Sequence, residues 1–308
     1  MSYHLGWRDE GGSPQEAGGK MLRPICCLLA CRAVGGDPER VLPAASALEL
    51  LHNFSLIHDD IEDGADLRRH RPTVWKLWGQ AQGINVGDAM LALAHLALFE
   101  LKTEGIAPQK VLQATRILDN TCLELCEGQY LDLSYDSRLD IGIDDYLVMI
   151  SKKTGALFEA SFKMGPLLGS NSDPLIDHLG QFGRKMGLAF QIRDDFLGIW
   201  GEERLTGKPR AADIQRKKKT LPIIYAFQQA ESGMRQELEK LYRQESLGSQ
   251  DVSKVMGILN DLKAQAYVQD MACQYYEKAL SALEAAGLAP AAQEELRESA
   301  VFLIERDH

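Results

Sequence analysis

One acidic stretch, residues 52–72, constrains this chain more than any other feature of its sequence. It reads HNFSLIHDDIEDGADLRRHRP, so a cluster of carboxylates is followed at once by arginines. Leu51, Ser55 and Asp59 recur every four residues, which predicts one helix face leading up to the carboxylates. Asp63 lies one turn beyond Asp59, and like charges at that spacing destabilise a helix by about 0.2–0.5 kcal/mol per pair. A bound cation would relieve this repulsion.

The residue types in this stretch indicate which cation to expect. Carboxylates without interleaved cysteines or a Glu-x-x-His pattern favour a hard ion, so we predict Mg²⁺ rather than zinc or iron. The alternative is structural, because many DDxxD strings are solvated surface or helix caps. The chain contains such a case in Asp144 and Asp145, which follow IGI and precede the apolar run YLVMI. That pattern is typical of a helix N-terminus, and we predict a structural role for the pair.

The composition argues against several classes of protein. Hydrophobic residues make up 45% of the 308-residue chain and charged residues 25%, which is sufficient for a substantial core. The net charge of −10 argues against a nucleic-acid partner. The six cysteines form no CxxC pair, which predicts reduced thiols in a cytoplasmic protein. We expect no signal peptide and no apolar run near the roughly 18 residues of a membrane span.

Helical periodicity without strand alternation predicts an all-α chain. We expect residues 1–19 to be a flexible lead-in and residues 20–308 to be a single domain of antiparallel helices with short connections. The expected helices include one that opens at Gly87 and one over residues 251–286. A long polar loop at 201–220 interrupts the pattern, and a loop of that length inside a domain is usually functional.

A second acidic pair, Asp194 and Asp195, lies in FQIRDDFLGIWG, late in another helical pattern. A frayed helix C-terminus is the structural alternative, although acids are unfavourable there because of the helix dipole. Two such pairs, each followed by basic residues, together indicate several Mg²⁺ ions with a polyphosphate between them. Neither GxxxxGK[ST] nor GxGxxG occurs, and no activated Ser or Cys is evident, so neither a nucleotide-binding fold nor covalent catalysis is indicated.

A series of motifs runs from residue 18 to the end of the chain. In order they are GGKMLRP; LLHNFSLIHDDIED with the trailing LRR and RPT; GDAML; GQYLDL; KKTGALFEA; GLAFQIRDD; TGKP; and KKTLP. This series resembles the trans-isoprenyl diphosphate synthases, or polyprenyl synthetases. The resemblance implies an all-α bundle of the isoprenoid synthase type with a central cavity, usually a homodimer. It implies Mg²⁺-dependent head-to-tail condensation of isopentenyl diphosphate with an allylic diphosphate.

The resemblance also implies roles for individual residues. The metal ligands would be Asp59, Asp63 and Asp194, supported by Asp60 and Asp195. The residues that hold the allylic diphosphate would be Arg68, Lys153, Lys208 and Lys218. Isopentenyl diphosphate would be bound without metal by Lys20, Arg23, His52 and Arg69. The reacting centre would be lined by Thr154 and Gln191. For His52 a buried core histidine remains the alternative.

Product length is expected to depend on the helix face just before the first acidic motif. Phe54 lies five positions before Asp59, with the small Ser55 beside it and Leu51 deeper, so Phe54 would act as a floor for the growing chain. The DDxxD motif lacks the two-residue insertion of typical bacterial farnesyl synthases. Geranylgeranyl diphosphate is therefore the expected product and farnesyl diphosphate the next. The alternative is that Phe54 belongs to the ordinary core.

The sequence departs from the family pattern at three points. Gly198 stands where many members carry a third aspartate, Met21 replaces a common Arg, and AAD at 211–213 replaces the commoner GSD. We expect the first departure to weaken metal affinity at most.

Two other functions are compatible with one acidic motif. A class I terpene cyclase uses DDxxD and Mg²⁺ but needs no isopentenyl site, and the joint presence of Lys20, Arg23 and Arg69 argues against it. A non-catalytic partner subunit of a heteromeric synthase would normally have lost an acidic motif, whereas both are present here.

Overall fold

Long helices form almost all of the regular structure in the described part of the chain, which confirms the all-α prediction. The computed structural model describes residues 1–16, 18–202 and 211–305. Its longer helices are α1 (Leu22–Ala33), α2 (Leu42–Glu62), α4 (Gln80–Phe99), α5 (Pro108–Tyr135), α7 (Ala156–Gly169), α8 (Asp173–Trp200), α12 (Ser232–Tyr242), α13 (Ser249–Asp261), α14 (Ala264–Ala285) and α15 (Pro290–Glu305). Its shorter elements are η1 (Glu39–Val41), α3 (Val74–Trp78), η2 (Glu100–Lys102), α6 (Ile143–Ile150), the π-helical turn η3 (Ser151–Gly155), α10 (Ala212–Gln215) and α11 (Leu221–Gln229).

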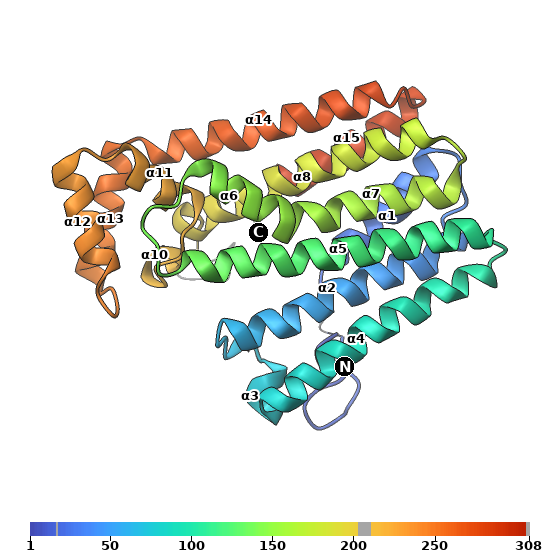
Figure 1. Cartoon of the computed structure of the whole chain (residues 1–308), viewed down its shortest axis with the longest axis horizontal. Coiled ribbons are helices and arrows are strands. Elements are labelled where there is room, and N and C mark those ends of the chain that lie inside the picture. The colour runs from blue at the N-terminus through green and yellow to red at the C-terminus, as the bar shows by residue number, and fades with distance from the viewer. Residues whose placement is uncertain (17, 203–210, 306–308) are drawn as a thin grey trace.

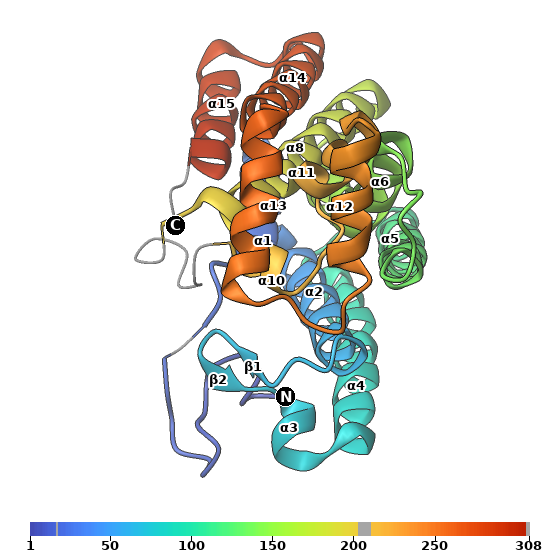
Figure 2. The ribbon, with the colours of Figure 1, turned by 90° about the vertical axis from the view of Figure 1, so that its left-hand side faces the viewer.

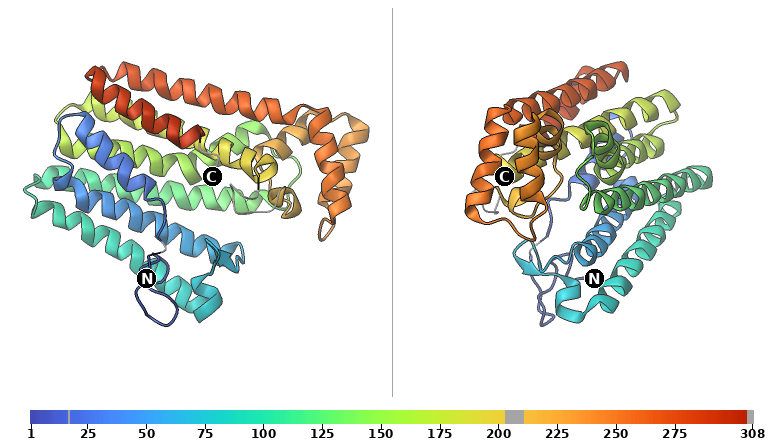
Figure 3. Two further views of the ribbon diagram at one scale, coloured as in Figure 1. Left: turned by 180° about the vertical axis from the view of Figure 1, so that it is seen from behind. Right: turned by 60° about the vertical axis from the view of Figure 1, so that its left-hand side comes forward.

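The long helices pack side by side and alternate in direction. In Figure 1, α2, α5 and α8 run toward one end of the bundle, while α4, α7 and α14 return from it. Helices α12 and α13 cap the end toward which α2, α5 and α8 run. Helices α1 and α15 lie on the face turned away from the viewer in Figure 1, as the rear view in Figure 3 shows. The C-terminal ends of α2 and α8 therefore lie at the same end of the bundle, and these ends carry the two acidic motifs.

Apolar faces at helical spacing hold this bundle together. Leu48 and Leu51 of α2 are fully buried and share a core cluster with Met90 of α4 and Leu118 of α5. A second cluster joins α8 to α14 and α1. Gly165 lets α7 approach α1 closely, since a Cβ atom there would lie 2.6 Å from the backbone nitrogen of Cys31.

Three predictions about local structure were wrong. Helix α4 begins at Gln80 rather than at Gly87. Gly87 is an interior glycine whose missing side chain makes room for the imidazole of His58. The helix expected over 251–286 is two helices, broken near Lys263, which has a left-handed φ of 53°. A short antiparallel hairpin, β1 (Leu67–Arg68) with β2 (Arg71–Pro72), follows the first acidic motif.

The segment predicted as a flexible lead-in makes defined contacts with this hairpin. The hydroxyl of Tyr3 donates to the carbonyl of Pro72 at 2.7 Å, and Arg71 Nη1 donates to the carbonyl of Tyr3 at 3.1 Å. Figure 2 shows the segment running alongside the hairpin below α2. Its flexibility stays a prediction.

One helix contradicts the expectation about apolar runs. Residues 80–102 are long and apolar enough to cross a membrane by length and composition, with a mean hydropathy of 1.4 over the most apolar window. Only 28% of that window is buried inside the structure. A core helix can pass the same test, so the finding by itself is weak evidence of a membrane span.

The close approach of α1 and α7 predicts a large effect of one methyl group. Gly165→Ala should lower the free energy of unfolding by about 1–3 kcal/mol, because the backbone of α1 cannot move aside easily. Gly257→Ala in α13 is the matched control, since a Cβ atom there meets nothing within 4 Å. The control should raise stability by about 0.5–1 kcal/mol. Urea unfolding of both variants measures the difference, and equal stabilities would contradict the packing argument.

Candidate active site

The first acidic motif lies at the C-terminal end of α2, where Arg68 of β1 partly neutralises it. Arg68 Nε donates to Asp60 Oδ1 at 2.7 Å, and its Nη2 lies 3.4 Å from Asp59 Oδ2. Asp60 is almost fully buried, and burial raises its pKa to about 6 although Arg68 opposes the rise. Asp63 lies at the helix C-cap, where partial desolvation of its carboxylate, together with Asp59, raises its pKa. The motif is thus a group of carboxylates under mutual repulsion.

Lys153 bridges this motif to α5. Its Nζ lies 3.2 Å from Asp59 Oδ1 and 2.5 Å from Asp132 Oδ2. Burial alone would lower the pKa of Lys153, but Asp59 and Asp132 outweigh it and hold the pKa above its ordinary value. The ammonium group therefore stays charged between two carboxylates. Sequence reasoning missed Asp132, although it lies in the GQYLDL motif.

A π-helical turn presents Lys153 to the site. The turn η3 lies between α6 and α7, and π turns inside longer helices are frequent at functional sites. Gly128 of α5 lets its helix pack directly on this backbone, since a Cβ atom there would lie 2.7 Å from Cα of Lys153. The turn is thereby fixed on the side of α5.

Arg184 of α8 fixes the turn from the other side. Its Nη1 donates to the carbonyl of Ser151 at 3.2 Å and to the hydroxyl of the same residue at 3.1 Å. The guanidinium also contacts Glu124 of α5 at 2.9 Å and Glu159 of α7. Arg184 therefore joins its own helix α8 to η3, α5 and α7. This residue was not singled out from the sequence.

A hydrogen-bonded chain orients the polar groups next to Lys153. The hydroxyl of Thr154 donates to Gln191 Oε1 at 2.8 Å, and Gln191 Nε2 donates to Asp195 Oδ1 at 3.0 Å. Asp195 Oδ2 accepts from the hydroxyl of Tyr146 at 2.7 Å and from the backbone N–H of Leu221 at 2.9 Å. Burial raises the pKa of Asp195 to about 7, although these donors favour the carboxylate. Both oxygens of Asp195 accept hydrogen bonds from protein groups, Oδ2 two and Oδ1 one.

The second acidic motif presents one carboxylate to solvent. Asp194 is exposed, whereas Asp195 is buried. The structure accounts for Gly198 at the position of the missing third aspartate. A Cβ atom on Gly198 would overlap the carboxylate of Asp213, since it would lie 2.7 Å from Cγ of that residue. Asp213 belongs to α10 and is 8% exposed. Its carboxylate occupies the space that a side chain at residue 198 would need.

A second group of polar residues contains cationic side chains and includes His52 of α2. Arg23 of α1, His52 of α2 and Arg69 of the hairpin turn lie close enough that both arginines lower the pKa of His52, after burial, which is the larger cause. The imidazole of His52 is therefore neutral at pH 7. Lys20 lies just before α1 and is exposed.

The structure brings most of the predicted residues to one end of the bundle. On or directly beside α2 lie Leu51, His52, Phe54, Ser55, Asp59, Asp60 and Asp63. The other elements carry Lys20, Arg23, Arg68, Arg69, Lys153, Thr154, Gln191, Asp194, Asp195 and Lys218. Lys218 is exposed after α10, near enough to Asp63 to oppose the rise in the pKa of that carboxyl. Lys208 lies outside the described residues. Asp145 accepts from the backbone N–H of Gly142 at 3.0 Å, as expected for a helix start.

The donor chemistry suits a hard cation. Carboxylates predominate at the first motif, and buried Asp60 Oδ2 lacks a hydrogen-bond partner among the described residues. Within residues 1–16, 18–202 and 211–305, no three His, Cys, Asp or Glu side chains converge closely enough to hold an ion by themselves. The carboxylates would therefore hold ions together with further oxygen ligands, such as those of a diphosphate.

The predicted central cavity stays an expectation. The pockets described in the structure lie beside the N-terminal segment, and the larger measures about 360 Å³.

Removing Arg184 should loosen the elements around the π turn. Arg184→Met should lower the free energy of unfolding by about 1–3 kcal/mol, because two half-buried carboxylates lose their partner. Arg235→Met breaks an exposed pair within one helix and should cost less than about 0.5 kcal/mol. Denaturant unfolding compares the two variants, and similar small losses would contradict the role given to Arg184.

Known proteins resemble this chain over most of its length. Farnesyl diphosphate synthase of Mycobacterium tuberculosis is 45% identical over 228 residues, which cover 73% of this chain but only 62% of that protein. Geranylgeranyl diphosphate synthase of Methanosarcina mazei is 38% identical over 87% of this chain and 80% of its own.

Solved structures share the fold. A polyprenyl synthetase of Streptomyces coelicolor has a TM-score of 0.91 and 34% identity, covering 98% of this chain and 90% of its own. A geranylgeranyl pyrophosphate synthase of Corynebacterium glutamicum, complexed with isoprenyl diphosphate and magnesium, has a TM-score of 0.83 and 26% identity, covering 94% and 87%. The polyprenyl synthetase family model matches residues 13–259. This chain belongs to the polyprenyl synthetase family.

Proposed function

We propose that this chain catalyses Mg²⁺-dependent head-to-tail condensation of isopentenyl diphosphate with an allylic diphosphate. The observation that carries the proposal is the presence of two adjacent anion sites of different kinds. One combines the carboxylates of α2 with Lys153, and therefore suits a diphosphate bound through metal ions. The other gathers Arg23, His52 and Arg69, and suits a diphosphate bound without metal. A condensing enzyme needs both.

The carboxylates of α2 would hold the metal ions jointly with the allylic diphosphate. Bound Mg²⁺ would stabilise the negative charge that develops on the departing diphosphate. Arg68 and Lys153 pair with Asp59. Once ions take over that role, both cations are free to contact the diphosphate oxygens.

The π turn would supply polar groups for the allylic cation. Thr154 presents its hydroxyl oxygen next to Gln191, whose amide is oriented by Asp195. These oxygens would face the positive charge while the isopentenyl double bond attacks. We therefore assign Asp195 to positioning Gln191, with Asp194 as the ligand of the second motif. No protein nucleophile is required.

The product we propose is geranylgeranyl diphosphate, with farnesyl diphosphate next. Phe54 is 7% exposed, and its ring packs on His58 with the centroids 4.8 Å apart. An aromatic group at this depth on α2 would limit chain growth. The relatives include synthases named for each of these two products.

A product assay tests the function. The purified protein is incubated with Mg²⁺, isopentenyl diphosphate and each of dimethylallyl, geranyl and farnesyl diphosphate, and the prenyl chains are sized. We expect elongation that ends at geranylgeranyl diphosphate. Hydrocarbon released from an allylic diphosphate alone would indicate a terpene cyclase. Complete inertness would indicate a non-catalytic partner subunit.

The role of Phe54 predicts a change in product length. Phe54→Ala should yield products at least one isoprene unit longer, because it removes the floor. Phe302→Ala, at a 62% exposed site on α15, is the control and should leave the products unchanged. Chromatography of the dephosphorylated products measures chain length at a temperature where both variants are folded. An unchanged distribution for Phe54→Ala would place this residue in the ordinary core.

Asp63 of the first acidic motif and Asp144 of the structural pair allow a matched test of metal binding. Asp63→Asn should lower the rate by about two to three orders of magnitude, since it removes a ligand of the ions that stabilise the departing diphosphate. Its stability should not fall, because the repulsion from Asp59 is relieved. Asp144→Asn, in the structural pair, should retain activity. Equal activity losses in both variants would contradict the assignment.

We propose that a second copy of the chain covers the exposed apolar face of α4 and α5. On α4 this face includes Ile84, Leu96 and Phe99, and on α5 it includes Leu112 and Leu123, each at least 48% exposed. The two helices are in contact, and a surface built from both can pair with itself about a two-fold axis.

Leu96→Glu combined with Leu123→Glu should convert a dimer to a monomer in sedimentation velocity. Phe302→Glu should leave the assembly unchanged. If the wild-type protein is a monomer in solution, or a monomer that binds vesicles through this face, the proposal of a dimer is wrong.

A further inference from the structure

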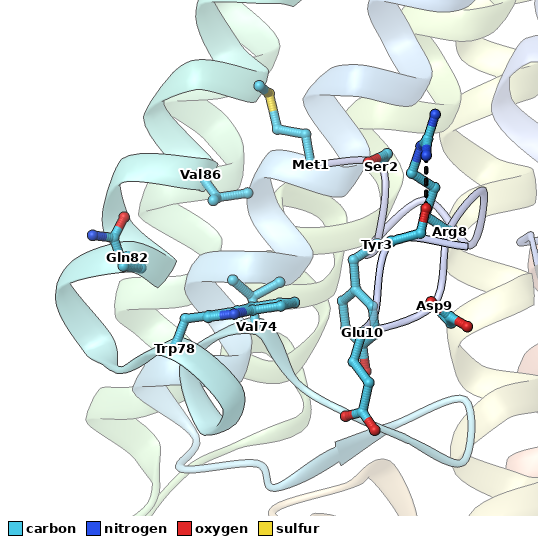
Figure 4. A pocket seen from close by; sticks show the side chains of 11 residues that line it. Met1, Ser2, Tyr3, Arg8, Asp9, Glu10, Val74, Trp78, Gln82 and Val86 are labelled. Atoms are coloured by element: carbon cyan, nitrogen blue, oxygen red, sulfur yellow. Dashed lines mark hydrogen bonds between the residues drawn. The ribbon is translucent and has the colours of Figure 1, made fainter. Parts of the chain in front are cut away.

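The first residues of the chain are anchored to the hairpin that carries Arg68 and Arg69. The ring of Tyr3 packs edge-on against Trp78 of α3 with centroids 5.1 Å apart, and the guanidinium of Arg71 lies 4.1 Å from its centroid. Figure 4 shows Tyr3 and Arg8 on one wall of a pocket, with Trp78 and other residues of α3 and α4 on the opposite wall. These contacts hold Tyr3 in place, directly before His4.

His4 lines a separate small pocket of cationic character. That pocket is lined by Tyr3, His4, Arg68, Arg69, Arg71, Pro72 and Thr73. None of these lining residues is acidic. Three guanidinium groups around one concavity are the arrangement expected for an anion site.

The imidazole of His4 is partly buried in this environment, and its Nε2 atom is shielded from solvent without a hydrogen-bond partner among the described residues. Burial, followed by Arg68 and Arg69, lowers the pKa of His4 to about 3, while a hydrogen bond with Asn53 opposes the shift. The ring is therefore neutral and carries one N–H, so it adds no repulsion to the nearby arginines. That proton lies on Nδ1 when the ring donates to Asn53 and on Nε2 in the other tautomer, which a bound diphosphate would favour.

His4 also belongs to the same electrostatic group as the predicted isopentenyl diphosphate residues. The pKa of His52 is lowered first by burial, then by Arg23, Arg69, Arg68 and His4. The nearest acidic influence on Arg69 comes from Glu49 and Asp60. Asp60 is hydrogen-bonded to Arg68, so its influence on Arg69 is shared between two guanidinium groups.

We propose that His4 is a binding residue of the metal-free diphosphate site and donates Nε2–H to the diphosphate held by Arg23 and Arg69. This inference rests on the proposed function for the identity of the ligand, isopentenyl diphosphate. The segment before α1 is then the outer wall of a substrate site. A polar nitrogen buried without a partner costs free energy, and a bound diphosphate would satisfy it.

Steady-state kinetics of two His4 variants test the proposal. His4→Phe keeps a planar ring but removes the donor, and should raise KM for isopentenyl diphosphate about tenfold or more. KM for the allylic diphosphate and kcat should change less than twofold. His4→Gln keeps a donor at a similar reach and should recover much of the affinity. His178→Phe, on the remote part of α8, is the control and should match the wild type.

Binding measurements separate this proposal from the proposed function. Calorimetry with inorganic diphosphate, without metal, should show about tenfold weaker binding to His4→Phe than to the wild type. If the wild type lacked condensation activity, the proposed function would fail while this anion site could still be confirmed. An unchanged diphosphate affinity in His4→Phe would overturn the proposal.

A spectroscopic measurement on the unaltered protein removes any dependence on variant folding. With ¹⁵N-labelled histidine, Nε2 of His4 should shift when isopentenyl diphosphate is added without metal, and the resonance is assigned by its loss in His4→Gln. A resonance that does not move would overturn the proposal. Equal rises of KM for both substrates in His4→Phe, with a lower melting temperature, would also do so, because they indicate a structural role alone.

Discussion

Repulsion among the carboxylates of α2 is the constraint on which the rest of the site depends. Asp59, Asp60 and Asp63 lie within two turns of one helix, and burial raises the pKa of the last two. The fold compensates with Arg68 from the hairpin and Lys153 from the π turn. These cations come from segments far apart in the sequence, so the bundle must bring the hairpin and the turn to the same end of α2.

The same arrangement separates two kinds of anion chemistry over a short distance. In the proposed function, the carboxylates and Lys153 suit a diphosphate bound through metal ions. The group of Arg23, His52 and Arg69 suits one bound without metal, and the proposed role of His4 adds this residue to it. The hairpin segment carries Arg68, which contacts the carboxylates, and Arg69, which belongs to the second group.

Local sequence pattern predicted an all-α chain and a helix leading up to Asp59, but it misplaced the start of α4 and missed the break between α13 and α14. The four-residue spacing that leads to Asp59 is a property of one helix, and it predicted α2. Long-range packing decided the rest. Gly87 resembles a helix start in the sequence, but it is an interior glycine that accommodates His58. The partners of Asp195, the bracing by Arg184 and the position of His4 depend on contacts between distant segments, which no single pattern contains.

The central claim is that the carboxylates hold metal ions only jointly with a diphosphate, since no three metal-binding side chains converge among the described residues. Titration with Mn²⁺, followed by electron paramagnetic resonance with and without inorganic diphosphate, tests it most directly. The account predicts weak binding of Mn²⁺ alone and tight binding of several ions when diphosphate is present. Equally tight binding without diphosphate would contradict it, because it would require a complete metal site within the protein.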